Sequence, residues 1–271
     1  MGDGIKRMKA ITGYSQNGLP YFRIGGGPRS LVIFGALSFK HQALSGLAVW
    51  GTSRRYRHFA KKFTTYYVGR KPGLPVGYSI QNMSEDYAAM VRNEIEAPVD
   101  LMGISTGGPI AQQFAADHPE LVHRLVLAMT GYHLIEGGAK LQRKLIDLTL
   151  QGKWRAAAAV QASITAGPVK PVATVVFWLL GKVVFENPQD PADGVAELEA
   201  EDKFDFKNRL VEIKEPTLVI GGDKDCFYPV RETAERIPDA QLILYKNTGH
   251  TAMLKPHFNR DVMNFLTKSE N

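Results

Sequence analysis

The sequence contains a single cysteine, Cys226, among its 271 residues. One cysteine cannot form an internal disulfide or a cysteine-based metal site, so the sequence does not require an oxidising compartment. The segment from Met1 to Ala10 carries several charged residues and lacks the apolar stretch of a secretory signal. We therefore expect a cytoplasmic protein.

Long hydrophobic runs are also lacking. The longest, from Val172 to Phe185, is interrupted by Lys182 and is shorter than the roughly 20 apolar residues that cross a bilayer. The net charge is +6, but the basic residues are scattered apart from short pairs such as Arg54-Arg55, and no nucleic-acid-binding motif accompanies them. The sequence thus predicts no membrane span and no nucleic-acid partner.

Short apolar runs alternate with helix-like segments in the first half and the last quarter of the chain, as is typical of a parallel sheet covered by helices. The expected strands are Leu31 to Phe34, Thr64 to Val68, Val99 to Gly103, Leu125 to Met129, Thr217 to Gly221 and Leu242 to Tyr245. Two earlier segments, Ala10 to Tyr14 and Tyr21 to Ile24, flank Asn17-Gly18 and predict an antiparallel hairpin at the sheet edge. The fold class is therefore α/β, with a mostly parallel central sheet flanked by helices.

The alternation of strands and helices is interrupted between Tyr132 and Phe206, where helix-like segments follow one another with no strand between them. This pattern predicts a helical cap, or lid, inserted over residues 132–206. The core domain is then formed by residues 1–131 and 207–271 together.

The apolar segment Phe177-Trp178-Leu179 of the predicted cap has two interpretations. Its side chains can simply pack inside the cap, because aromatic residues at helical spacing usually face a core. They can also line a pocket for the hydrophobic portion of a substrate.

The pentapeptide Gly103-Ile104-Ser105-Thr106-Gly107 lies between an expected strand and the helix-like segment from Pro109 to Asp117. A serine nucleophile must project from a tight turn between a strand and a helix, and glycines on both sides remove the Cβ atoms that would collide there. A short pattern of this kind also arises by chance in a glycine-rich turn. The strand and helix around it favour Ser105 as a nucleophile.

Two acidic residues, Asp223 and Asp225, follow the expected strand from Thr217 to Gly221. A carboxylate at the carboxyl end of a strand can accept the second N–H of a histidine, and we assign this role to Asp225, with Asp223 as the alternative. Without a nucleophile and a histidine nearby, the same segment would be read as a solvated turn.

One of the seven histidines, His250, lies in the loop segment Asn247 to His250, between the last expected strand and a helix from Pro256 to Thr267. His133 begins the predicted cap, and the others lie in helix-like or helix-flanking segments: His41, His58, His118, His123 and His257. A single histidine on a loop is usually structural. The order of serine, acid and histidine along the chain nevertheless predicts a catalytic triad of Ser105, Asp225 and His250.

Over nearly its full length, the chain resembles a cap-bearing member of the α/β-hydrolase superfamily, of the esterase and carbon–carbon-bond hydrolase type. Besides the three motifs, the segments from His118 to Leu127 and from Ile213 to Ile220 are similar to those that precede the cap and the acid in this family. One departure is Phe34-Gly35, where the family usually has His-Gly.

The resemblance implies an oxyanion hole made of backbone N–H groups, so the loss of the histidine side chain removes no donor. We assign one donor to Ala36 and the other to Thr106, with Leu37 as the alternative to Ala36.

These features predict a cofactor-free serine hydrolase that transfers an acyl group from a small-molecule, ester-like substrate to water. A carboxylic ester with a hydrophobic portion is the expected substrate. Thioesters, lactones and carbon–carbon bonds are alternatives for the same residues, and a slow-turnover ligand-binding protein of the same fold is an alternative of another class. The sequence leaves the oligomeric state open, and it is compatible with a homodimer.

Overall fold

The computed structural model describes residues 9–165 and 191–268. An eight-stranded sheet with the order β1-β2-β4-β3-β5-β6-β7-β8 forms its centre, and only β1 and β2 run antiparallel to their neighbours. The strands are β1 (Ile11–Tyr14), β2 (Pro20–Ile24), β3 (Arg29–Phe34), β4 (Phe63–Val68), β5 (Val99–Ile104), β6 (Val122–Ala128), β7 (Thr217–Gly222) and β8 (Gln241–Tyr245). The α/β fold and the edge hairpin expected from the sequence are confirmed.

Several expected strands begin one or two residues earlier than predicted, and the largest difference is at β6. β6 starts at Val122, three residues before the expected Leu125, so His123 lies in a strand and not beside a helix as the sequence suggested. The reason is a long-range contact, because Val122 pairs with Val99 and the His123 ring lies 2.8 Å, Nδ1 to Oδ1, from the buried Asp100 carboxylate.

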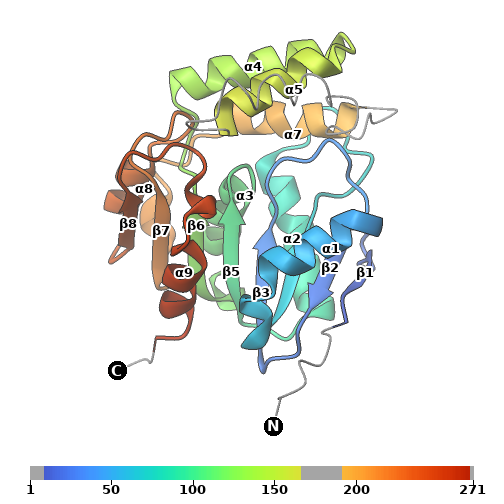
Figure 1. The fold of residues 1–271 in the computed structure, drawn as a ribbon. Coiled ribbons are helices and arrows are strands. Elements are labelled where there is room, and N and C mark those ends of the chain that lie inside the picture. Colours follow the sequence, from blue (N-terminus) through green and yellow to red (C-terminus); the bar gives the residue numbers. More distant parts are fainter. Residues whose placement is uncertain (1–8, 166–190, 269–271) are drawn as a thin grey trace.

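Helices cover both faces of the sheet (Figure 1). The α-helices are α1 (Gly46–Tyr56), α2 (Ile80–Glu94), α3 (Gly107–Asp117), α4 (Glu136–Leu150), α5 (Trp154–Thr165), α7 (Ala192–Asp202), α8 (Val230–Arg236) and α9 (Phe258–Leu266). Buried residues of α2, α3 and α8 pack with one face of the sheet, and those of α1 and α9 pack with the other. The sheet is therefore the middle of three layers, as expected for strands that are apolar on both sides.

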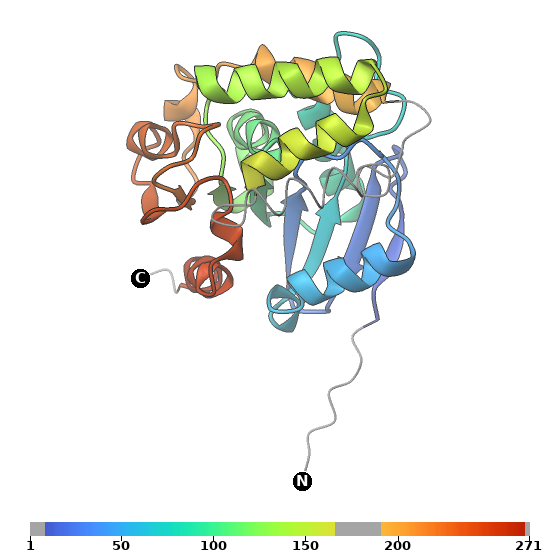
Figure 2. The same ribbon diagram turned by 45° about the horizontal axis from the view of Figure 1, so that its top comes forward.

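The helices α4, α5 and α7 lie between β6 and β7 in the chain, and we call them the helical layer. They lie across the carboxyl ends of the parallel strands, at the top of Figure 1, and Figure 2 shows α4 and α5 extending over this end of the molecule. The amide of Phe206 donates to the carbonyl of Tyr132 at 2.9 Å, so the two ends of the intervening segment meet at the core. Phe177, Trp178 and Leu179 lie outside the described residues.

The helical layer has an apolar core of its own. Phe39, from the loop after β3, packs into it with residues of all three helices, namely Leu145, Ile146, Ala157, Ala158, Val195 and Leu198. Phe39 also occupies the position that a side chain at Gly194 of α7 would need, because a Cβ there would lie 2.3 Å from the ring. The loop after β3 is thus packed against the layer above it.

Within residues 9–165 and 191–268, no helix is both long and apolar enough to cross a membrane. In the same part of the chain, no group of three or more histidine, cysteine, aspartate or glutamate residues could hold a metal ion.

Candidate active site

Ser105 occupies a sharp turn between β5 and α3. Its φ angle is +51°, a left-handed conformation that is unfavourable for a residue with a side chain and that concentrates at functional sites. Two backbone hydrogen bonds hold the turn: the Ser105 amide donates to Ala128 at 3.0 Å, and the Gly108 amide donates to Ser105 at 2.8 Å. The turn therefore projects the serine side chain beyond the end of the strand.

The glycines on either side of Ser105 are required by close contacts. A Cβ at Gly103 would lie 2.6 Å from the Ala111 side chain, and a Cβ at Gly107 would lie 2.2 Å from the backbone oxygen of Phe34. The turn thus packs directly against the end of β3, where any larger residue would push the two segments apart.

Ser105, His250 and Asp225 form a continuous hydrogen-bonded chain across three loops. The Ser105 hydroxyl lies 2.8 Å from Nε2 of His250, and Nδ1 of the same ring lies 2.9 Å from Oδ2 of Asp225. Because a carboxylate can only accept, Nδ1 carries the proton and donates it, which leaves Nε2 of a neutral ring free to accept from the serine hydroxyl. This is the arrangement in which a histidine can activate a serine.

Two backbone hydrogen bonds hold the buried side chain of Asp225 in place. Its side chain is 1% exposed, and Oδ1 accepts backbone hydrogen bonds from Phe227 at 2.9 Å and Tyr228 at 3.3 Å. The second oxygen is thereby left to face the histidine.

The alternative acid, Asp223, is exposed and does not reach His250. Its Oδ1 accepts from the Thr248 amide at 3.1 Å, and this backbone hydrogen bond is the main cause that holds the pKa of Asp223 below its usual value. Asp223 therefore stabilises the loop that carries His250, through a hydrogen bond two residues before the histidine.

Two backbone N–H groups lie in the loops next to Ser105 with their hydrogen-bonding capacity unused. In the described part of the chain, the amides of Ala36 and Thr106 donate to no other protein group. Phe34, which replaces the histidine usual at the end of β3, is fully buried, and its ring packs 4.0 Å from that of Tyr87 and 5.4 Å from that of Phe114. This substitution thus belongs to the core beneath the loop.

Comparison with known proteins matches the model of the alpha/beta hydrolase family to residues 41–259, which is most of the chain. The chain belongs to this family. It is therefore an enzyme, a hydrolase of the α/β-hydrolase superfamily.

Individual relatives are distant. The hydrolase is 27% identical over 216 residues to a 2-hydroxy-6-oxononadienedioate/2-hydroxy-6-oxononatrienedioate hydrolase of Pseudomonas sp, a match that covers 73% of this chain and 75% of that one. It is 25% identical over 185 residues to the pimeloyl-[acyl-carrier protein] methyl ester esterase of Nitrosomonas europaea, covering 65% of this chain and 72% of that one. The crystal structure of the enol-lactonase from Burkholderia xenovorans LB400 has the same fold, with a TM-score of 0.75 and 19% identity over 95% of this chain and 100% of that one.

Two aromatic rings of the hydrolase pack beside the His250 imidazole. The ring centroids of Phe227 and Tyr228 lie 4.9 and 5.7 Å from that of His250. Tyr228 is buried and donates its hydroxyl to the carboxyl group of Glu201 on α7. Burial raises the pKa of Tyr228 well above its usual value, while a hydrogen-bonding contact with Ser105 acts in the opposite direction. The tyrosine therefore lies between Glu201 of the helical layer and Ser105.

The sequence did not point to four buried polar residues around the site: Arg70, Glu197, Glu201 and Tyr228. The only signal in the sequence is their position in the chain. Arg70 lies two residues after the fourth strand, and Tyr228 lies three residues after Asp225. The two glutamates lie one turn apart on α7, at the spacing that puts both on one face.

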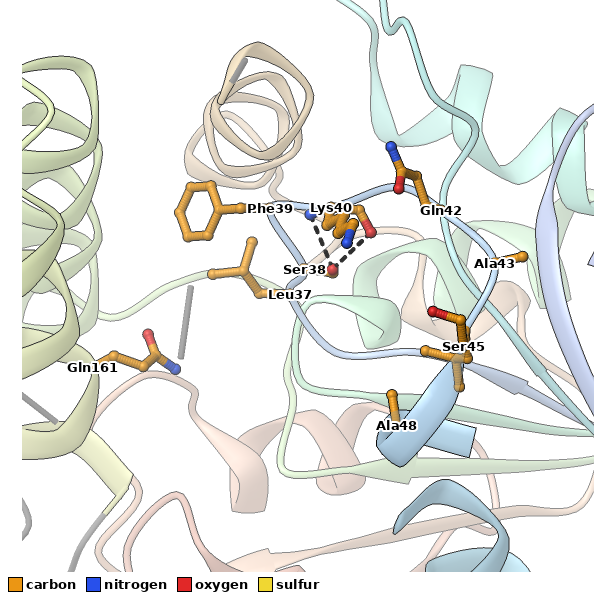
Figure 3. A pocket seen from close by; sticks show the side chains of 10 residues that line it. Leu37, Ser38, Phe39, Lys40, Gln42, Ala43, Ser45, Ala48 and Gln161 are labelled. Atoms are coloured by element: carbon orange, nitrogen blue, oxygen red, sulfur yellow. Dashed lines mark hydrogen bonds between the residues drawn. The ribbon is translucent and has the colours of Figure 1, made fainter. Parts of the chain in front are cut away.

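A cavity of about 290 Å³ lies between the loop after β3 and the helical layer (Figure 3). Its described lining residues are Leu37, Ser38, Phe39, Lys40, Gln42, Ala43, Leu44, Ser45, Ala48 and Gln161. Leu37 and Phe39 extend from the loop on the side of the layer, where Gln161 of α5 also lies. The cavity thus begins one residue beyond Ala36 and combines apolar with polar side chains.

Proposed function

We propose that this hydrolase cleaves small ester-like substrates by acyl transfer through Ser105, His250 and Asp225. The observation that carries the proposal is the continuous chain of hydrogen bonds from Ser105 to His250 (2.8 Å) and from His250 to Asp225 (2.9 Å). The left-handed turn at Ser105 is a second, independent support, because this conformation is costly and serves to expose a nucleophile.

The reaction follows from the proton positions. Nε2 of His250 accepts the Ser105 proton while the serine oxygen attacks the carbonyl carbon, and the protonated ring then donates that proton to the departing alcohol. Asp225 keeps the imidazole in the correct tautomer and stabilises its positive charge. A water molecule, deprotonated by the same histidine, then releases the acyl group.

The negative charge that develops on the substrate oxygen needs hydrogen-bond donors. The unused amides of Ala36 and Thr106 are our candidates, with Leu37 as the alternative to Ala36, because backbone donors fixed in advance stabilise this charge most effectively.

We assign the segment 132–206, which includes the helical layer, to the role of a cap over the site, and residues 1–131 and 207–271 to the core. The cavity beside Leu37 supports a substrate with a hydrophobic portion, since its loop leads directly from Ala36 to the layer. Its polar side chains are also compatible with a polar substrate such as the one in the name of the Pseudomonas sp relative, and carbon–carbon bond cleavage is the second candidate reaction.

The decisive experiment is covalent labelling with a fluorophosphonate, which requires an activated serine. We expect modification at Ser105 and turnover of short p-nitrophenyl esters, both lost in Ser105→Ala and both kept in Ser53→Ala, which removes a serine of α1 that does not line the cavity. Labelling at another residue, or no labelling, would refute the proposal. Labelling without ester turnover would favour the second candidate or a slow-turnover binding protein.

A further inference from the structure

Arg70 lies directly behind the proposed oxyanion hole. Its side chain is 2% exposed and its Nη1 donates to the carbonyl of Gly35 and, at 3.2 Å, to that of Ala36. Nη2 donates to the hydroxyl of Thr106 at 2.8 Å. One guanidinium group therefore touches both loops that carry the proposed oxyanion donors.

The contacts with the two carbonyls determine where the N–H groups point. The carbonyl of Gly35 and the amide of Ala36 belong to one planar trans peptide, in which C=O and N–H point in opposite directions. Because Arg70 binds the Gly35 carbonyl, the N–H of Ala36 points away from the guanidinium group. The Ala36 carbonyl stands in the same relation to the amide of Leu37, the alternative donor.

Glu197 of α7 neutralises this buried arginine. Its Oε1 lies 2.8 Å from Nη2 of Arg70, and its Oε2 lies 3.4 Å from Nε2 of His41. Burial would raise the pKa of Glu197, but the charge of Arg70 and the neighbouring His41 ring outweigh this effect and hold the pKa below its usual value. The carboxylate is thus ionised, as a buried arginine requires.

We propose that Arg70 is the positioning residue of the oxyanion hole and that Glu197 holds it in place from the helical layer. This inference rests on the proposed acyl-transfer function. Because Glu197 belongs to α7, the layer then supports transition-state stabilisation as well as covering the site. Arg70 acts through the backbone of its neighbours and touches no substrate.

A buried ion pair can also be purely structural, and the same molecule provides the comparison. Asp100 near the start of β5 is a buried carboxylate that lies 3.4 Å from Arg29 and 2.8 Å from His123. Like Glu197, Asp100 has an arginine and a histidine as partners, but it lies at the amino end of β5, whereas Ser105 follows the carboxyl end of that strand. Asp100→Asn is therefore a matched control for Glu197→Gln.

A matched control also exists for the arginine. Arg124 is buried and donates through both terminal nitrogens to backbone carbonyls, those of Phe265 and Lys268. Arg70→Lys keeps the positive charge but loses the planar fork that reaches both loops, and Arg124→Lys makes the same change away from the site.

We expect Glu197→Gln and Arg70→Lys to lower kcat on a short p-nitrophenyl ester by about 10- to 100-fold, with KM changed less than about threefold. We expect kcat to change more than KM because an oxyanion hole binds a negative charge that develops only in the transition state. The rate of fluorophosphonate labelling should fall in parallel. Asp100→Asn and Arg124→Lys should lower the melting temperature without these losses.

Thr106→Val tests the inference without changing any charge, since it removes the hydroxyl that accepts from Arg70 and keeps the backbone amide. A smaller loss of kcat in this variant supports the inference even if Glu197→Gln does not fold. If the Arg70, Glu197 and Thr106 variants lose no more kcat than the controls, the inference is wrong while the proposed function stands. A wild-type protein that is not labelled at Ser105 overturns both.

Discussion

Replacing Glu201 by glutamine should remove a pH dependence of stability that the wild-type protein carries. The Glu201 side chain is 1% exposed on α7, where it accepts from the Tyr228 hydroxyl. Burial raises the pKa of Glu201 from 4.5 to about 8, and the negative charge of Glu197 adds to the effect of burial. The folded protein therefore keeps a proton on Glu201 at neutral pH.

The sign follows from the proton balance. Below about pH 4.5 the carboxyl group is protonated in both the folded and the unfolded chain, so it causes no pH dependence. Above that value the unfolded chain loses the proton first, and the free energy of unfolding falls as the pH rises towards about 8. Over about 3.5 pH units at about 1.4 kcal/mol each, the loss reaches about 5 kcal/mol.

The measurement is urea unfolding from about pH 5 to about pH 9. Glutamine resembles the protonated acid, so Glu201→Gln and wild type should be similarly stable at the acidic end, and the variant should be more stable by several kcal/mol at the alkaline end. Glu199→Gln, an exposed change on the same helix, should follow the wild-type curve. Parallel curves for wild type and Glu201→Gln would refute the reasoning.

Two further substitutions test the site itself. Asp225→Asn should lower kcat by about a thousandfold or more, because an asparagine side chain no longer fixes the tautomer of His250. Asp223→Asn should lower kcat by less than about tenfold. Steady-state kinetics in the reverse order would show that Asp223, and not Asp225, is the acid of the triad. Leu37→Ala should raise the ratio of kcat/KM for long over short esters by about tenfold by enlarging the cavity, with little change in melting temperature, and the exposed Leu150→Ala should leave that ratio unchanged. A constant ratio in Leu37→Ala would mean that the cavity holds no acyl chain.

Local patterns were sufficient for most of the sheet. Buried parallel strands are continuous apolar runs, and the expected strands Leu31 to Phe34 and Thr217 to Gly221 are recognisable because each is short and has a glycine at or just after its end. The start of β6 was misplaced because His123 and Arg124 are polar, and they enter the strand only through partners elsewhere in the chain, such as Asp100.

The candidate triad could be proposed because serine, acid and histidine each follow a strand at the same edge of the sheet, a property of the order of elements. The buried ion pair between Arg70 and Glu197 could not be predicted from the sequence. On α7, helical periodicity would place Glu197 on an exposed face, and its burial depends on Arg70, 127 residues earlier in the chain. Long-range charge pairing leaves no trace in local spacing.

The ion pair between Arg70 and Glu197 also limits how this protein can change over evolution or be engineered. A helical insertion over an α/β core looks like a module that could be replaced by another. Here, a replacement that covers Arg70 without supplying a carboxylate would leave a buried unpaired charge, at a cost of about 3 to 5 kcal/mol. The same helix also binds the next loop, where Asp193 accepts from the amides of Gly73 and Leu74 at 2.9 and 2.7 Å. The insertion and the segment after β4 must therefore be inherited, or transplanted, together.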